Sequence, residues 1–314
     1  MRWINKAVLV CALCFLSLPA NSITEDTVFE AAKAGDTEKV IEIVERNPLE
    51  ANARDVQGAT PLHKAVAEGH YDTAEALLDL GAKPEPRALV DGTPLHQAPT
   101  PELVDLLVER GAHVNSKKAK LYDTPLHTAA WRGDPKVADA LLRHGASVNA
   151  VNKIGFTPLH YAASRGHTKM AKLLLESGAD PGAQDMTGLS VLHWAAGMDR
   201  TEIMRMLIDA GADIEAKDRN GWTPLHSAVM MDGNNAVDLL ISSGARVNVR
   251  DTMYGATPLH WAAGMGKKKI VKALLAAGAD PSMKNNEGKT PAKLAREAGR
   301  RDIAKLIQRQ KKDR

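Results

Sequence analysis

Residues 157–166 read Thr-Pro-Leu-His-Tyr-Ala-Ala-Ser-Arg-Gly, and this stretch carries the signals of one short α-helix. The hydroxyl of Thr157 is suited to cap the first turn, and Pro158 fits the first helical position, where its missing N–H is not needed. Small residues such as Ala162 let a neighbouring helix approach closely, and Gly166 is suited to end the helix. The stretch therefore predicts a short helix that packs closely against others.

A second helix is predicted directly after the first. Met170 and the leucines at 173–175 give it an apolar face, and Gly178 is placed to end it. Gly155, just before the first helix, allows a turn. A unit of this size cannot bury both helices by itself, so it must lean on similar units on either side.

This unit recurs along nearly the whole chain after residue 22. The tetrapeptide Thr-Pro-Leu-His, or a weaker version of it, returns at intervals of 31 to 34 residues and begins at Thr27, Thr60, Thr93, Thr124, Thr157, Ser190, Thr223, Thr257 and Thr290. In its period and its residues the pattern resembles the ankyrin-repeat family, whose unit of about 33 residues is a β-turn plus two antiparallel helices. The resemblance implies an all-α solenoid of about nine repeats.

The predicted organisation follows the period. Residues 1–22 form a signal peptide, and residues 23–54 form an N-terminal capping repeat. Residues 55–284 form seven repeats that start near 55, 88, 119, 152, 185, 218 and 251, and residues 285–314 form a C-terminal capping repeat with a basic tail. The bases of the last helix predict a solvated cap; the alternative is a docking surface for an anion.

The first segment has the layout of a cleavable signal peptide. Arg2 and Lys6 precede an uncharged run from 7 to 18, then Pro19 and small residues lead to an expected cut after Ser22. An uncleaved anchor is the alternative, but twelve apolar residues are fewer than the roughly 20 that span a membrane. We expect the chain to be exported, to have no stable membrane insertion after cleavage, and to lose both of its cysteines, at positions 11 and 14.

Histidine occupies the fourth place of the tetrapeptide in seven repeats: His63, His96, His127, His160, His193, His226 and His260. A row of metal ligands is one interpretation. Equivalent atoms of stacked repeats lie about 10 Å apart, however, and an ion reaches only about 2 Å to each ligand. We therefore predict no metal site, and expect each ring to form a hydrogen bond across the turn to the next repeat.

Other chemistry finds little support in the sequence. The run 264–268 has Lys268 where a phosphate loop needs a hydroxyl, and no nucleophile elbow or zinc-protease helix occurs. We predict no enzyme and no cofactor. The formal charge of +3 falls to about +1 without Arg2 and Lys6, so nucleic acid is not expected as a partner. Residues 23–55 carry nine acids and four bases, whereas 289–314 carry ten bases and three acids.

One repeat departs from the pattern. The repeat that begins at Thr93 lacks about three residues between its helices and carries Pro99 and Pro101 there, which predicts a shortened first helix. Tyr122 stands where the next turn should have glycine. We expect a change of curvature around residues 95–123.

Aromatic residues and methionine gather at variable positions of the turns and first helices. Ankyrin-family partners usually meet these parts, and such residues are enriched at binding cores. The predicted contact residues are Trp131, Phe156, Tyr161, Trp194, Met198, Trp222, Met230, Met231, Tyr254, Trp261 and Met265, with Arg132 and Arg165 beside them. Packing between neighbouring first helices is the alternative, above all for Trp194 and Trp261.

These observations favour a non-catalytic scaffold in the bacterial periplasm, acting as a monomer that binds a protein or peptide. A secreted effector or toxin accessory that engages a host or competitor protein is the first alternative. A small-molecule carrier or an enzyme that uses the groove is an alternative of another class.

Overall fold

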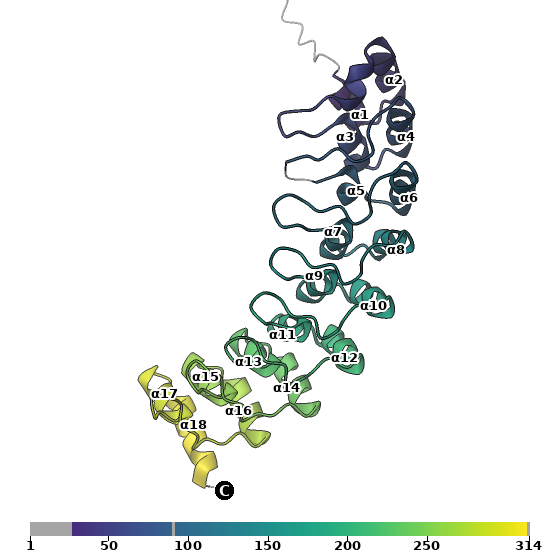
Figure 1. Cartoon of the computed structure of the whole chain (residues 1–314). Helices are drawn as coiled ribbons and strands as arrows, with labels where there is room; N and C mark the ends of the chain where they lie inside the picture. The colour runs from purple at the N-terminus through teal and green to yellow at the C-terminus, as the bar shows by residue number, and fades with distance from the viewer. Residues whose placement is uncertain (1–26, 90–91, 313–314) are drawn as a thin grey trace, which may run out of the picture.

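The computed structural model describes residues 27–89 and 92–312. In these ranges the chain forms nine pairs of α-helices, one short 3-10 helix (η1, Pro48–Asn52) and no β-strand. The pairs stack one beside the next into an elongated solenoid (Figure 1). The predicted all-α repeat architecture is confirmed. The predicted signal peptide, residues 1–22, lies outside the described residues.

The helices form two layers. The first helix of each repeat lies in the inner layer: α1 (Val28–Ala34), α3 (Pro61–Glu68), α5 (Pro94–Gln97), α7 (Pro125–Arg132), α9 (Pro158–Arg165), α11 (Val191–Gly197), α13 (Pro224–Met230), α15 (Pro258–Met265) and α17 (Pro291–Glu297). The second helix lies in the outer layer: α2 (Thr37–Arg46), α4 (Tyr71–Asp79), α6 (Pro101–Glu109), α8 (Pro135–Arg143), α10 (Thr168–Glu176), α12 (Thr201–Asp209), α14 (Asn234–Ser242), α16 (Lys268–Ala276) and α18 (Arg301–Lys312).

The core is a continuous strip of leucine and alanine between the two layers. The tetrapeptide leucine is at most 1% exposed wherever it occurs: Leu62, Leu95, Leu126, Leu159, Leu192, Leu225 and Leu259. Ala162 and Ala163 on α9 are fully buried, as their small size permits where helices meet closely. Each repeat therefore completes the core of its neighbours, and stability adds up along the stack.

The irregular repeat has the predicted short first helix. α5 has four residues, whereas α3 and α7 each have eight. Tyr122 takes a left-handed backbone with φ 62°, the conformation that glycine adopts in other turns.

The change of direction was predicted too early in the chain. The stack runs nearly straight from α1 to α8 in Figure 1 and turns from α9 onward, with the first helices and the turns on the inside of the bend. The outer helix α6 keeps nine residues, as α4 and α8 do, so the outer layer continues regularly past the short α5.

Candidate protein-binding face

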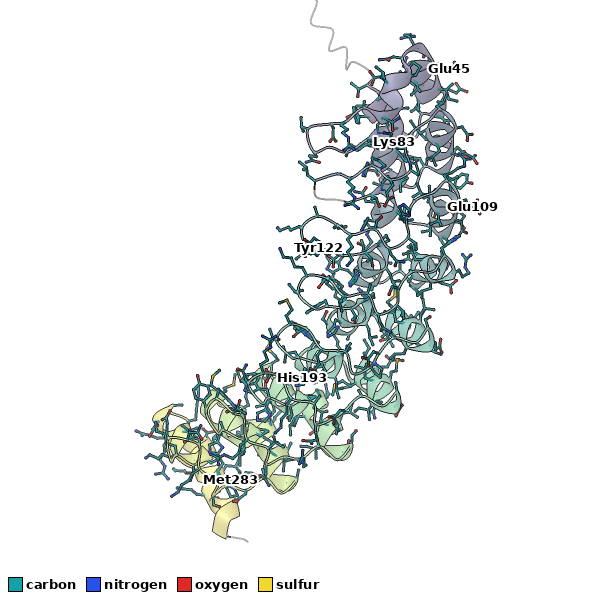
Figure 2. The ribbon with its side chains drawn as sticks, viewed as in Figure 1. Glu45, Lys83, Glu109, Tyr122, His193 and Met283 are labelled. Carbon is teal, nitrogen blue, oxygen red and sulfur yellow. The ribbon has the colours of Figure 1, made fainter. Side chains whose placement is uncertain are left out.

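The inside of the bend is formed by the exposed sides of the first helices and by the turns that link the repeats; we call this surface the inner face. Figure 2 shows Tyr122 on one of these turns, His193 within the stack, and Glu45 and Glu109 on outer helices. A long partner that lies in the bend would therefore contact side chains of the turns and of the first helices.

The turns are joined to one another through their backbones. The N–H of one turn donates to a carbonyl of the turn before it, from Leu89 to Gln57 (3.0 Å), Lys153 to Leu121 (2.8 Å), Met186 to Ile154 (3.0 Å), Arg219 to Thr187 (3.1 Å), Thr252 to Asn220 (2.8 Å) and Asn286 to Tyr254 (2.8 Å). These bonds link neighbouring turns through their backbones, although the donor residues themselves are exposed.

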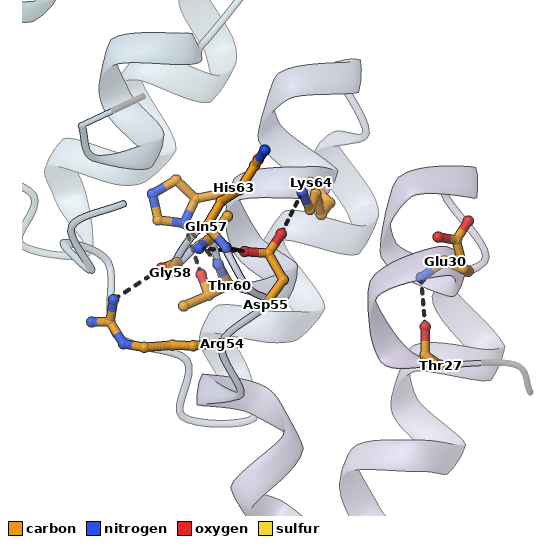
Figure 3. Close-up of polar contacts among 10 residues, drawn as sticks. Thr27, Glu30, Arg54, Asp55, Gln57, Gly58, Thr60, His63 and Lys64 are labelled. Carbon is orange, nitrogen blue, oxygen red and sulfur yellow. Dashed lines mark hydrogen bonds and ion pairs between the residues drawn. The ribbon is translucent and has the colours of Figure 1, made fainter. Parts of the chain in front are cut away.

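An aspartate or asparagine shapes many of the turns. In the turn of Figure 3, Asp55 Oδ1 accepts the backbone N–H groups of Gln57 (2.8 Å) and Ala59 (2.9 Å), while Oδ2 pairs with Lys64 Nζ at 2.7 Å. Equivalent carboxylate or amide oxygens accept turn N–H groups at Asn152, Asp185, Asp218, Asp251 and Asn285. Sequence reasoning missed this role, although each residue stands five or six positions before the tetrapeptide.

The tetrapeptide histidines tie each repeat to the next. In the first tetrapeptide, the backbone N–H of Thr60 donates to His63 Nδ1 at 3.1 Å, and the same bond forms within the tetrapeptides of the other six histidines. An N–H group can only donate, so Nδ1 is unprotonated and the neutral ring carries its proton on Nε2. The Nε2–H of His63 then donates to the carbonyl of Gly92, 3.1 Å away in the following turn.

The predicted bridge to the next repeat is confirmed for five of the seven histidines: His63, His96, His127, His193 and His260. The Nε2 atoms of His160 and His226 are buried and lie toward the carbonyls of Leu189 and Ala256 without a hydrogen bond of normal geometry. Burial lowers the pKa of His96, His160 and His226 to about 4, because the charged ring would lose its hydration. The pKa values of His127, His193 and His260 are also lowered by burial.

Three of the predicted contact residues form a first aromatic cluster. Phe156 lies 5.4 Å from Tyr161 and 5.1 Å from Trp194 between ring centroids, in edge-to-face contacts. Trp194 is half-buried and its Nε1–H donates to Asp185 Oδ2 at 2.9 Å. Phe156 is only 8% exposed and stacks on His160, so its ring packs within the cluster and offers a partner little contact area.

The polar end of Tyr161 is also held. Its hydroxyl donates to Asp123 Oδ1 at 3.3 Å and accepts from Asn152 Nδ2 at 3.2 Å. Burial, followed by the negative charge of Asp123, raises the pKa of Tyr161 to about 12. The first cluster is thus a rigid platform whose polar atoms are satisfied from the neighbouring turns.

A second cluster lies two repeats further on. Trp261 meets Trp222 and Tyr254 edge to face, each with ring centroids 5.6 Å apart, and its Nε1–H donates to Asp251 Oδ2 at 2.8 Å. Trp222 and Trp261 are half-buried, whereas Tyr254 is 45% exposed. Trp261 thus donates to an aspartate of its own turn as Trp194 does. Both residues pack between neighbouring repeats, and both keep part of the ring exposed.

The remaining predicted contacts lie around the two clusters. Trp131 is 47% exposed, and the guanidinium of Arg165 lies 4.2 Å from its ring centroid. Arg132 is exposed and donates from Nη1 to the carbonyl of Gln97 at 2.9 Å. The four methionines lie at the ends of inner helices: Met230 and Met265 are the last residues of α13 and α15, and Met198 and Met231 directly follow α11 and α13. Met231 is 59% exposed, and the other three are half-buried.

Exposed apolar residues form a row at the turn tips, and the sequence reasoning placed only Tyr122 and Met253 among the variable positions that a partner could meet and missed the other four. It consists of Val56, Leu89, Tyr122, Ile154, Met186 and Met253, which are 41% to 99% exposed; we call it the tip row. Each member stands two to four residues before its tetrapeptide, where turns ordinarily carry polar residues. That recurrence was readable from the sequence, but it took the structure to show that these side chains are not buried against the next repeat.

In the part of the chain that the structure describes, no group of three or more His, Cys, Asp or Glu side chains is arranged to hold a metal ion. Over the same residues, no helix is both long enough and apolar enough to cross a membrane.

Stacked helix pairs, a recurring Thr–His tie and a face built from variable turn residues define a repeat-solenoid protein. The family model for ankyrin repeats (three copies) matches residues 11–88, 28–118, 95–185, 177–251 and 233–313, and the chain belongs to this family. Ankyrin repeats form protein–protein interaction scaffolds, and the family is generally non-catalytic.

The chain is similar over short segments to several known proteins. It is 41% identical over 91 residues to ankyrin repeat and SOCS box protein 16 of Homo sapiens, covering 28% of this chain and 20% of that protein. It is 37% identical over 100 residues to ankyrin repeat and SOCS box protein 11 of Mus musculus, covering 31% and 30%. Acyl-CoA-binding domain-containing protein 1 of Arabidopsis thaliana is 40% identical over 62 residues, covering 20% and 18%. The chain thus spans less than a third of the length of each of these relatives.

Proposed function

We propose that this chain is a non-catalytic scaffold of the bacterial periplasm, and that it binds a protein or peptide along its inner face. The observation that carries the proposal is the tip row. Val56 is 99% exposed, Leu89 72% and Met186 55%, and backbone bonds hold their turns beside one another. Apolar side chains that recur on one exposed ridge contribute nothing to the core, and such patches mark interaction sites.

The two aromatic clusters favour the inner face as the binding surface as well. Trp194 and Trp261 are fixed by their bonds to Asp185 and Asp251, so little side-chain entropy is left to lose when a partner binds. The half-buried rings, whose polar atoms are hydrogen-bonded, provide rigid apolar contact area. The tip row and Met231 provide side chains that can adapt to the shape of a partner. A partner that lies along the bend would contact both.

The proposed location rests on the first 22 residues, with their basic start, short apolar run and small residues before the expected cut. Fractionation of the native cells tests it. Release of a shortened chain by osmotic shock supports the periplasm; recovery of that chain from the culture medium supports the secreted alternative, and an unprocessed chain in the cytosol contradicts both.

Site-specific photo-crosslinking tests the face. A photoreactive amino acid replaces Met186 in the tip row or Met231 on the inner face, since both side chains are more than half exposed and their loss leaves the core intact. Tyr71 on the outer helix α4, which is 37% exposed, is the matched control. We expect one defined adduct from the two inner positions and none from position 71.

The contrary outcomes are clear. Equal adducts from both faces would show that the inner face is not selective. No adduct from Met186 or Met231, in a chain whose circular dichroism and unfolding match the wild type, would remove the proposed binding face.

A further inference from the structure

The inner helix of the last repeat has bases at positions that are buried in earlier repeats. Lys293 takes the place of the tetrapeptide histidine, and Arg296 takes the place of Ala163, which is fully buried. Both bases are exposed, and in the described part of the chain no further helix pair covers them. Because lysine and arginine are seldom buried without a partner, the two bases do not suit a following repeat of the usual kind.

The outer helix α18 carries three more exposed bases. Arg301, Lys305 and Arg309 are spaced by four residues, so they share one side of the helix. Ile303 and Ile307, which are at most 2% exposed, occupy the side that packs on the stack. The bases therefore point away from the packed side of α18.

Earlier outer helices show where two of these positions point. Counted from the glycine between the two helices of a repeat, Thr37 and Arg301 hold the same position, as do Glu75 and Lys305. The hydroxyl of Thr37 makes a 2.8 Å hydrogen bond to the following repeat, and Glu75 lies 3.9 Å from Arg110 of the following repeat. The bases of α18 thus face the free end of the stack, where α17 and α18 lie in Figure 1.

The two helices present their bases on one surface. A cavity of about 200 Å³ is lined by Lys293 and Arg296 from α17 and by Ile307 and Gln308 from α18. We call the surface around it the end face, and its five exposed bases are Lys293, Arg296, Arg301, Lys305 and Arg309.

Nearby acids leave most of this positive charge in place. Residues 285–309 carry seven bases and three acids. Glu297 pairs with Lys289 at 2.8 Å, a turn glutamate pairs with the same lysine, and Asp302 pairs with Lys268 of α16 at 3.3 Å. The bond to Lys289 lowers the pKa of Glu297, and the charge of Lys293 adds to this effect. The acids are thus held mainly by bases outside the end face.

We propose that the end face docks the protein end-on to an anionic membrane surface, with the phosphate groups of lipid headgroups as its ligands. A layer of headgroups offers many phosphates side by side, so it can attract the bases of both helices at once. Clusters of about four to eight bases bind anionic lipid in this way. Docking through the end face goes beyond the proposed scaffold and leaves the inner face free for a protein.

Charge along the stack also favours this orientation. The first repeat, residues 27–55, carries seven acids and four bases, so an anionic surface repels it while it attracts the end face. A second copy of this chain is not complementary to the end face, because Lys39 stands at the place of Thr73, which contacts the preceding repeat. The centre of a protein interface is usually apolar and poor in lysine, unlike the end face.

Co-sedimentation with vesicles tests the docking. The chain, purified from the native cells, is mixed with vesicles of phosphatidylcholine alone or with about one third phosphatidylglycerol. We expect at least about tenfold tighter binding to the anionic vesicles, and we expect this preference to disappear as salt screens the charges.

Paired variants separate the end face from the overall charge. Arg301→Glu with Lys305→Glu reverses two of its bases, and Lys169→Glu with Arg205→Glu reverses two exposed bases of the outer helices α10 and α12. Since each charge contributes about fivefold, we expect the first pair to weaken binding at least about 100-fold and the second pair to weaken it far less. Arg301→Lys with Lys305→Arg should bind as the wild type does. Circular dichroism and urea unfolding check that each variant is folded.

Three outcomes would overturn the inference. Equal binding to neutral and anionic vesicles would assign the interaction to apolar contacts, and equal loss in the two reversed pairs would assign it to net charge alone. Tighter binding of polyglutamate or an oligothymidylate than of the vesicles, at equal total charge, would assign the end face to an acidic protein or to nucleic acid.

Discussion

Acidification should unfold this protein through its buried histidines. An unfolded histidine has a pKa of 6.5, whereas burial holds His96, His160 and His226 near 4 in the folded chain. At pH 5 the unfolded state therefore binds a proton at each of these positions and the folded state hardly does. The free energy of unfolding consequently decreases as the pH falls below 6.5, and the loss levels off near pH 4.

The size of the effect follows from the two pKa values. A shift from 6.5 to about 4 costs about 2 kcal/mol per histidine at pH 5, or about 6 kcal/mol for the three together. His127, His193 and His260 act in the same direction, because their pKa values are lowered as well. Since folded domains are stable by only about 5–15 kcal/mol, the loss would be a large share of the total.

Urea unfolding, followed by circular dichroism and by tryptophan fluorescence between pH 7.5 and 5, measures this loss. Met186→Ala is the control, because this side chain is 55% exposed and carries no titratable group, so its removal should leave the slope against pH unchanged. His96→Asn should reduce the slope near pH 5 by about one proton, or about 1.4 kcal/mol per pH unit. The reasoning would be refuted if the free energy of unfolding were the same at pH 7.5 and 5, and if the imidazole resonances of His96, His160 and His226 titrated near pH 6.5 in the folded chain.

Four further outcomes are expected. Leu159→Ala should destabilise the chain by about 2–5 kcal/mol in urea unfolding, since Leu159 is fully buried; a change below 1 kcal/mol, on the order of a surface substitution, would contradict the shared core. Trp194→Phe should cost about 1–2 kcal/mol, because Asp185 loses an indole donor; an unchanged urea midpoint would show that this bond contributes nothing. Tyr122→Gly should stabilise the chain by about 1 kcal/mol and so raise the urea midpoint, since glycine adopts a left-handed backbone without strain; a lower midpoint would refute this. Tyr161 should ionise only near pH 12, so Tyr161→Phe should remove the most alkaline part of the tyrosine absorbance titration.

The sequence predicted the repeat because every unit solves the same packing problem with the same residues. The leucine of each tetrapeptide must fill the strip between the layers, so its period of about 33 residues is visible without coordinates. The shortened α5 was also predictable, since Pro99 and Pro101 cannot continue a helix. The place of a residue within its repeat could therefore be predicted from the spacing and from the backbone preferences of proline and glycine.

Contacts between repeats were harder to predict, because they join residues that the period alone does not pair. Phe156 was predicted on the binding face, yet Trp194 of the following repeat covers it. Trp194 and Trp261 were weighed as packing residues, but their aspartate partners stand nine and ten positions away and were not identified. Four members of the tip row were missed, among them Val56 and Met186, because the exposure of a side chain depends on how far its turn stands away from the helices.

Features that depart from the repeat are the most informative about binding in such a fold. A uniform stack would place a full helix at α5, glycine at position 122 and polar residues at the turn tips. The chain instead has a helix of only four residues at α5, a tyrosine held in a left-handed backbone, and exposed apolar side chains such as Val56. None of these departures improves the core, and the left-handed tyrosine costs stability by about 1 kcal/mol. Their common position on the inside of the bend is accounted for if that surface is complementary to a partner.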